Sequence, residues 1–177
     1  MRVHSCLVSA SALIVVAAAV VACGGDDRTP TATPRVSGPN LTASSGQTTV
    51  TLGRSAIDPF HIQADFENSK VEIKVKDPSD INVNSSTVAA GGTTGWHKHS
   101  GPVLVVVTSG VFTMYHADDP SCTAHTYPAG TAFYEVPEDV HIGRNEGTVP
   151  LTWVATAILP RGVAARIDMP VPGNCAF

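Results

Sequence analysis

Three histidines are the residues whose type and spacing best suit them to chemistry. His97 and His99 flank Lys98, and residues two apart in a strand point to the same face, so their imidazoles are predicted to lie side by side. His141 opens another β-rich stretch and supplies a third imidazole. Neutral imidazole binds Zn, Fe, Cu and Ni, so three of them on rigid strands predict a metal site with open positions. The alternative is a metal-free pocket lined by hydrogen-bonded histidines.

Short β-rich stretches, separated by glycine and proline turns, must position these side chains. The expected strands cover residues 71–76, 81–90, 102–108, 111–116, 132–136, 140–145 and 150–159. The segment Val71–Lys76 alternates apolar and charged residues, which predicts a half-buried strand, whereas Val103–Val107 is apolar on both faces and predicts a central one. Several short strands at this spacing predict an all-β sandwich or barrel.

The histidines also stand among other residues at fixed intervals. The first group is Gly91, His97, His99 and Gly110, and the second is Gly130, Pro137, His141 and Asn145. In this order the two groups resemble the paired motifs of the cupin superfamily, over roughly residues 70–170. The resemblance implies a single antiparallel jelly-roll β-barrel of the cupin type, with a divalent ion (Mn, Fe, Ni or Zn) held inside by the three histidines.

Two departures from the cupin motifs bear on that site. Val103 occupies the position of the metal-binding glutamate, and Asp139 that of a glycine in the second motif. The site is then either a three-histidine one or one completed by Glu135, Glu138 or Asp139. Glu135 has the best claim, because it lies in an expected strand close to His141, and it is also the candidate general base. Loss of the glutamate equally allows a fold that has kept its shape and lost its metal.

The resemblance implies a small-molecule ligand or substrate and, because cupins often pair through their sheets, a homodimer. The activity it implies is that of a metal-dependent dioxygenase or isomerase. The alternatives are a non-catalytic module that binds a metal or small ligand, and an envelope interaction domain; the fold alone does not decide between enzyme and binder. Nucleic acid is not an expected partner, because the net charge is −4 and no basic stripe is present.

The amino-terminal segment predicts export. Arg2 precedes an apolar run over residues 7–22, shorter than the roughly 20 residues of a membrane-spanning helix. The run ends in Val20-Val21-Ala22-Cys23, which resembles the lipobox of bacterial lipoproteins. That resemblance implies a signal peptide over 1–22, acylation of Cys23, and a place on the extracytoplasmic face of the cell envelope, held to the membrane by lipid alone.

The remaining organisation follows from composition. Residues 23–49 are rich in Gly, Thr, Ser and Pro and predict a flexible tether; 50–69 predict an arm or first strands, and 70–177 the barrel domain. Cys122 and Cys175 remain as an even pair in an oxidising compartment, which predicts a disulfide.

Overall fold

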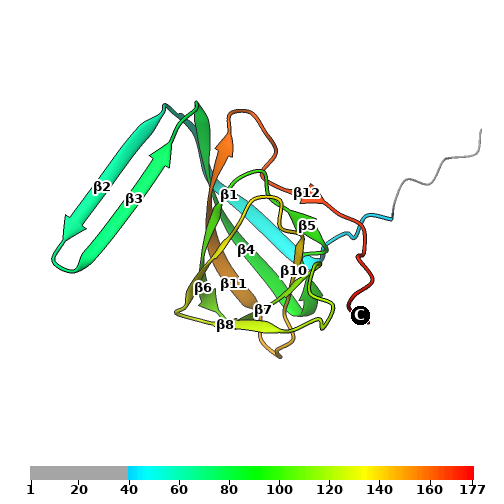
Figure 1. The fold of residues 1–177 in the computed structure, drawn as a ribbon. Coiled ribbons are helices and arrows are strands. Elements are labelled where there is room, and N and C mark those ends of the chain that lie inside the picture. The colour runs from blue at the N-terminus through cyan, green and yellow to red at the C-terminus, as the bar shows by residue number, and fades with distance from the viewer. Residues whose placement is uncertain (1–39) are drawn as a thin grey trace, which may run out of the picture. The chain divides into compact units, whose positions relative to one another are not determined.

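The computed structural model describes residues 40–177, whose regular structure is entirely β (Figure 1). The strands are β1 (Ser45–Ile57), β2 (Phe60–Phe66), β3 (Ser69–Val75), β4 (Ser79–Thr93), β5 (His97–Lys98), β6 (Val103–Ser109), β7 (Val111–His116), β8 (His125–Pro128), β9 (Ala132–Glu135), β10 (His141–Arg144), β11 (Leu151–Pro160) and β12 (Ile167–Asp168). The predicted signal segment and Cys23 lie outside the described residues. Within residues 40–177 there is no helix long and apolar enough to cross a membrane.

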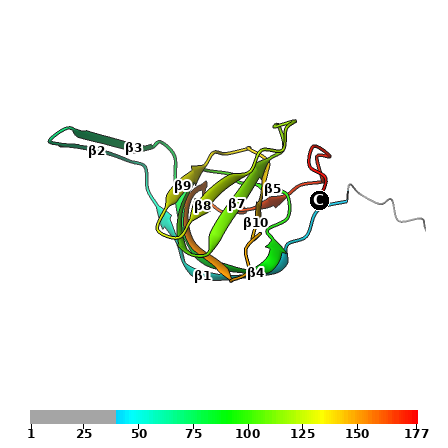
Figure 2. The same cartoon turned by 90° about the horizontal axis from the view of Figure 1, so that it is seen from below.

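Ten of these strands form one antiparallel sheet that curls into a nearly closed barrel (Figure 2). The long strand β4 pairs with β1 along one edge and with β11 along the other. The sheet then continues from β11 to β6 and from β6 to β9. Strand β10 pairs with β4, β5 and β7, so the two stretches that carry the histidines are neighbours on one wall. The all-β barrel expected from the sequence is confirmed.

Strand β6 shows how the barrel is packed. Val103, Val105 and Val107 point inward and are almost fully buried, in the main hydrophobic core with Phe112 and Leu151. The residues between them, at positions 104 and 106, are at least half exposed. The prediction that this strand is central is correct for its hydrogen bonding, because β11 and β9 flank it. Its outer face is also apolar, but no layer of described residues covers it.

The domain begins earlier in the chain than its composition suggests. Strand β1 starts at Ser45, inside the segment 23–49 that we predicted as a tether. This strand has mostly exposed side chains and pairs with β4 through its backbone, so it carries little of the apolar alternation by which a strand is recognised. Leu41 forms a further bridge with Pro170. Residues 50–69 divide between the end of β1, a barrel strand, and β2, which lies in a separate hairpin.

Strands β2 and β3 form a two-stranded sheet of their own (Figure 1). The register places the apolar residues on one face and the charged and polar residues on the other. The apolar face consists of Phe60, Ile62, Ala64, Phe66, Val71, Ile73 and Val75. Val71 is 52% exposed and Ile73 is 40% exposed, so the prediction of a half-buried strand over 71–76 is wrong. The alternation is real, but the barrel does not cover this face.

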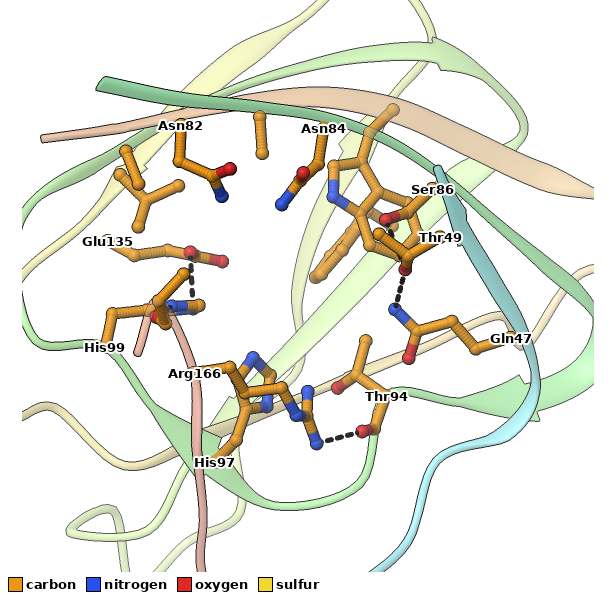
Figure 3. Close-up of a pocket in the computed structure, with 16 residues that line it drawn as sticks. Gln47, Thr49, Asn82, Asn84, Ser86, Thr94, His97, His99, Glu135 and Arg166 are labelled. Carbon is orange, nitrogen blue, oxygen red and sulfur yellow. Dashed lines mark hydrogen bonds and ion pairs between the residues drawn. The ribbon is translucent and has the colours of Figure 1, made fainter. Parts of the chain in front are cut away.

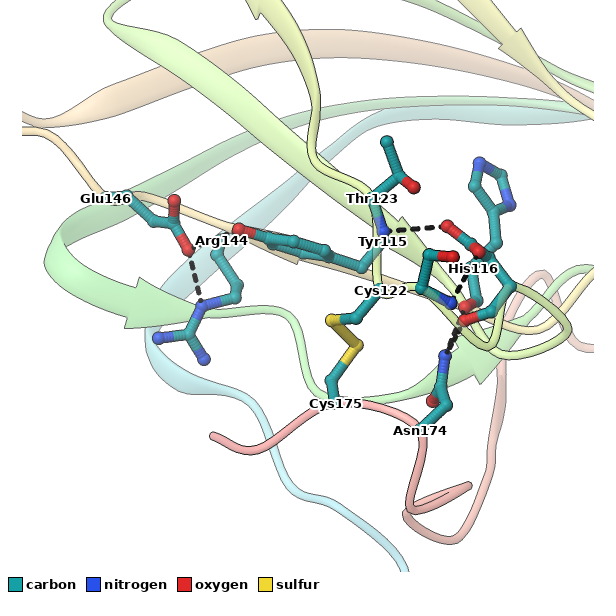
Figure 4. The surroundings of a disulfide bond; sticks show 10 residues. Tyr115, His116, Cys122, Thr123, Arg144, Glu146, Asn174 and Cys175 are labelled. Carbon is teal, nitrogen blue, oxygen red and sulfur yellow. Dashed lines mark hydrogen bonds and ion pairs between the residues drawn. A yellow bond between two sulfur atoms is a disulfide. The ribbon is translucent and has the colours of Figure 1, made fainter.

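The predicted disulfide between Cys122 and Cys175 is present, with Cα atoms 5.3 Å apart (Figure 4). It joins the carboxy-terminal segment to the loop that follows β7. The amide of Asn174 adds hydrogen bonds to the carbonyl oxygens of His116 and Asp119 in the same loop. The bridge therefore attaches the chain end close to the strand that pairs with His141.

Candidate metal centre

The three predicted histidines converge inside the barrel. His97 lies in β5 and His141 opens β10, and these two residues are direct partners in the antiparallel pairing of the strands. His99 follows β5 on the same face of the chain. One nitrogen from each ring lies within 4.8 Å of the others, with ring centroids 4.6–5.3 Å apart. His141 is fully buried and His97 is 5% exposed, so the cluster is largely shielded from solvent.

A backbone carbonyl holds the second nitrogen of each ring. Nδ1 of His97 lies 2.9 Å from the oxygen of Gly95, and Nδ1 of His99 lies 2.8 Å from that of Ala165. Nδ1 of His141 lies 3.1 Å from the oxygen of Asp139. A carbonyl only accepts, so each Nδ1 carries the hydrogen and donates it, which leaves the lone pair on Nε2. Three neutral imidazoles with this arrangement are ready to bind a metal.

Two of the three Nε2 atoms lack hydrogen-bond partners among the described residues. In the part of the chain that the structure describes, the buried Nε2 atoms of His99 and His141 have none. The carboxylate of Glu135 is close, with oxygens 3.0 Å from Nε2 of His99 and 3.4 Å from Nε2 of His141, but the contacts lack hydrogen-bond alignment. Lone pairs that face a carboxylate require a cation or a proton between them. The residues therefore fit a divalent metal ion.

The pKa shifts within the cluster are consistent with a cation bound between the imidazoles and the carboxylate. Burial opposes the ionisation of Glu135, but the imidazoles of His141 and His99 outweigh it and hold the pKa of the carboxyl below its usual range. Burial lowers the pKa of His99, yet the neighbouring Glu135 carboxylate outweighs burial and raises it. Burial, together with the positive charges around it, brings the pKa of His97 well below its ordinary value. A neutral His97 beside an anionic Glu135 is the protonation state that favours a bound cation.

Strand register explains how Glu135 reaches the site. Val103, at the position where the cupin motif has its glutamate, is the direct partner of Glu135 across the β6–β9 pair. Neighbouring residues in register point to the same face of a sheet, so the carboxylate enters the barrel beside the valine. Glu135 is 7% exposed. The carboxylate is thus supplied from the next strand, as the sequence reasoning allowed.

The two other acids that we considered do not reach the cavity. Glu138 is exposed and pairs with Lys98 on the outside of the barrel. Asp139 accepts a hydrogen bond from Nδ1 of His116 at 2.9 Å and lies 3.8 Å from Nδ1 of His141, on the side away from the shared centre. Asp139 therefore contributes to the surroundings of His141 and not to the ligand set.

Asn145 of the second motif group and Trp96, the neighbour of His97, support the fold around the site. The buried side chain of Asn145 donates to the carbonyl oxygens of Val88 and Val149 and accepts from the N–H of Gly147, so it shapes a turn. Trp96, which precedes His97, is buried and packs in a small core with neighbours that include Ile142.

His97, His99 and Glu135 line one part of a cavity of about 110 Å³ (Figure 3). Its lining includes residues that the sequence reasoning missed: Gln47, Thr49, Asn82, Asn84, Ser86 and Arg166. The period of two in Asn82, Asn84 and Ser86 was a detectable signal, because a strand places such residues on one face. No comparable signal marked Arg166, which lies 25 residues beyond the last motif histidine at position 141. Asn82, Asn84 and Ser86 place polar groups on the wall opposite His97, whereas Arg166 lies beside His97 (Figure 3).

Comparisons with known proteins agree with this geometry. Residues 84–157 match the family described as Cupin domain. No curated protein sequence matches the chain.

Solved structures similar to this chain include the polyketide cyclase RemF from Streptomyces resistomycificus, at 13% identity and a TM-score of 0.49, over 75% of this chain and 80% of that one. An uncharacterised double-stranded β-helix protein from Klebsiella pneumoniae is 20% identical with a TM-score of 0.43, over 63% of this chain and 84% of that one. A cupin-like protein from Thermotoga maritima is 18% identical with a TM-score of 0.44, over 51% and 65%. The chain is therefore similar to the Cupin domain family over residues 84–157, and its β-barrel and three-histidine cluster are consistent with that likeness.

Proposed function

We propose that the domain binds one divalent metal ion through His97, His99 and His141 and acts on a small molecule bound beside it. The observation that carries this proposal is the orientation of the rings: each Nδ1 faces a backbone carbonyl, so the Nε2 atoms are free to meet at one point. Three protein ligands that leave further positions open are typical of catalytic metal sites. When bound, such an ion polarises a ligand oxygen or lowers the pKa of water.

Glu135 is the proposed general base of this site. Its carboxylate is buried, and its low pKa keeps it ionised at neutral pH. It lies next to two of the metal-binding rings, so it can accept a proton from a ligand held at the same place. The barrel shields this carboxylate from most solvent, because only 7% of Glu135 is exposed.

Val103 favours a second function, that of a binding module without turnover. A valine at the position of the cupin glutamate leaves three neutral imidazoles as the ligands, with the Glu135 carboxylate beside them and not in the position of the motif glutamate. Such a site captures a metal, or a small anion through the metal, without catalysis. The two functions share the same residues and differ in whether a bound ligand is chemically changed.

Metal analysis tests the site itself. The purified chain should carry close to one metal ion, and replacement of both His97 and His99 by alanine should abolish it. His125→Ala is the matched control, because this imidazole is exposed and lies outside the cluster. Equal metal contents in the wild type and in the double variant, with the fold intact by circular dichroism, would rule out both the catalytic and the capture function.

We also propose that the chain is a lipoprotein of the cell envelope, with a signal peptide over 1–22 and a lipid on Cys23. The support is the order of Arg2, apolar run and lipobox, together with a disulfide, a bond that persists in oxidising compartments. Metabolic labelling with a fatty acid should mark the wild type and not Cys23→Ser. Labelling of both proteins, or of neither, would contradict the proposal.

The proposed protein partner is a second copy of the chain. The hairpin exposes an apolar face that includes Ile62 and Phe66, and the barrel of the same chain exposes Leu104, Val106 and Tyr134 on the outer face of β6 and β9. Two apolar surfaces on one chain suit a reciprocal contact between two copies.

Light scattering tests this pairing. The wild type should have twice the monomer mass, and the double variant Ile62→Glu, Phe66→Glu should be monomeric. Gln63→Glu, on the polar face of the same strand, should leave the mass unchanged. A monomeric wild type would refute the pairing.

A further inference from the structure

The cavity beside the histidines is built to hold a ligand of a particular kind. Its volume of about 110 Å³ is well below the 300–1,000 Å³ of sites for drug-sized ligands, so the ligand has few heavy atoms. Three alanines, Ala155, Ala157 and Ala165, line it and leave the space open. The polar groups around this space determine which small molecule it accepts.

One wall presents amide groups with unused hydrogen-bonding capacity. Asn82 and Asn84 point inward from β4, two residues apart (Figure 3). The Oδ1 atom of Asn84 is buried and has no hydrogen-bond partner among the described residues. An unpaired buried acceptor is costly, so this wall requires a donor from the ligand.

The adjacent hydroxyl groups of this wall are already paired. Oγ of Ser86 and Oγ1 of Thr49 share a hydrogen bond of 2.9 Å, and Thr49 accepts a second one from Gln47. They therefore close that end of the cavity and leave the two asparagines as the groups that face the ligand.

The opposite wall presents a cation. Arg166 lines the cavity beside His97 (Figure 3). Its Nε donates to Asp168 at 2.7 Å and its Nη2 to the carbonyl oxygen of Thr94 at 2.6 Å. These bonds fix the plane of the guanidinium and leave Nη1 without an acceptor among the residues that the structure describes. Asp168 neutralises part of the charge, but it is about half exposed and is therefore screened by solvent.

We propose that the cavity binds a short hydroxy acid, with its carboxylate at Arg166 and the histidine cluster and its hydroxyl groups toward Asn82 and Asn84. A carboxylate satisfies the free edge of the guanidinium, and hydroxyl hydrogens satisfy the amide oxygen. This proposal rests on the proposed function, because the carboxylate also lies next to the metal.

Calorimetric titration with three matched probes tests the proposal. Glycerate carries both the carboxylate and the hydroxyls; propanoate lacks the hydroxyls, and glycerol lacks the carboxylate. The metal-loaded full chain should bind glycerate at least about tenfold more tightly than glycerol, the value of one charge-assisted hydrogen bond, and about two- to tenfold more tightly than propanoate, the value of one neutral hydrogen bond. No binding of glycerate, or no preference for it, would overturn the proposal.

Substitutions on the two walls test which wall binds the carboxylate of the ligand and which binds its hydroxyl groups. Arg166→Gln should weaken glycerate and propanoate alike by about tenfold or more. Asn84→Ala should reduce the affinity for glycerate to that for propanoate. The controls are Arg144→Gln, which removes a guanidinium that stacks on Phe177, and Thr87→Ala, on the exposed face of β4. Equal effects of a variant and its control, with thermal melting confirming the fold, would refute that assignment.

The same titration after chelation separates this proposal from the proposed function. Arg166 and Asn84 contact the ligand without the metal, so the preference for glycerate should persist at lower affinity in the chelated chain. A wild type that holds no metal but prefers glycerate would refute the metal centre alone. A wild type that holds metal and treats the three probes equally would refute the hydroxy-acid site alone.

Discussion

Glu135→Gln isolates the contribution of the carboxylate that enters the barrel beside Val103. The substitution keeps the shape of the side chain and removes its charge, which lies 3.0 Å and 3.4 Å from Nε2 of His99 and His141. Two unit charges 4 Å apart interact by about 4 kcal/mol at an effective dielectric constant of 20, which gives the scale of the loss. The net effect is smaller, because Glu135 also stabilises a proton on His99 that the metal must displace. We expect about 10- to 100-fold weaker metal binding, the range for partners next to a metal ligand.

Competition for Zn²⁺ against a chromophoric chelator at neutral pH measures this change. Glu138→Gln is the matched control, because Glu138 is only three residues away but pairs with Lys98 outside the barrel. The control should bind Zn²⁺ like the wild type. Equal affinities of Glu135→Gln and the control would refute the placement of the carboxylate at the metal. A complete loss, as deep as that of His97→Ala, would make Glu135 a ligand and not a base.

Three further predictions concern stability. Replacement of Cys122 and Cys175 by serine should lower the free energy of unfolding by up to about 4 kcal/mol in chemical denaturation, because the bridge closes a sequence separation of 53 residues; an unchanged midpoint would contradict this. Gly143→Ala should cost about 1–3 kcal/mol, since its Cβ would overlap the ring of Phe112, while Gly53→Ala, with open space around its Cβ, should be nearly neutral. Zn²⁺ at 100 times its Kd should stabilise the wild type by about 2.7 kcal/mol in thermal melts, and absence of this shift would argue against a site formed only in the folded chain.

Local spacing was sufficient for the histidine pair and for most strands. His97 and His99 are two residues apart, and any extended backbone presents them to the same side. The alternation in Val71–Lys76 likewise predicted a strand correctly. It could not predict what that strand packs on, because alternation identifies an apolar face without identifying its neighbour.

Composition was a poor guide to a strand that buries little apolar surface. Strand β1 is held by backbone hydrogen bonds to β4 and exposes most of its side chains, so its first residues resembled a tether. The run Val103–Val107 correctly predicted a central strand, but its apolar residues on both faces did not show that the barrel buries only every second one.

By itself the sequence determined an all-β barrel that resembles the cupins, the pairing of Cys122 with Cys175, and a set of histidines able to bind a metal. Only the tertiary structure decided that Glu135 lies beside Val103, and that Arg166 faces the amides of β4 across the cavity. The reason is that side-chain periodicity is a property of a few adjacent residues. Strand register and barrel closure, in contrast, join residues far apart in the chain, and no local pattern specifies them.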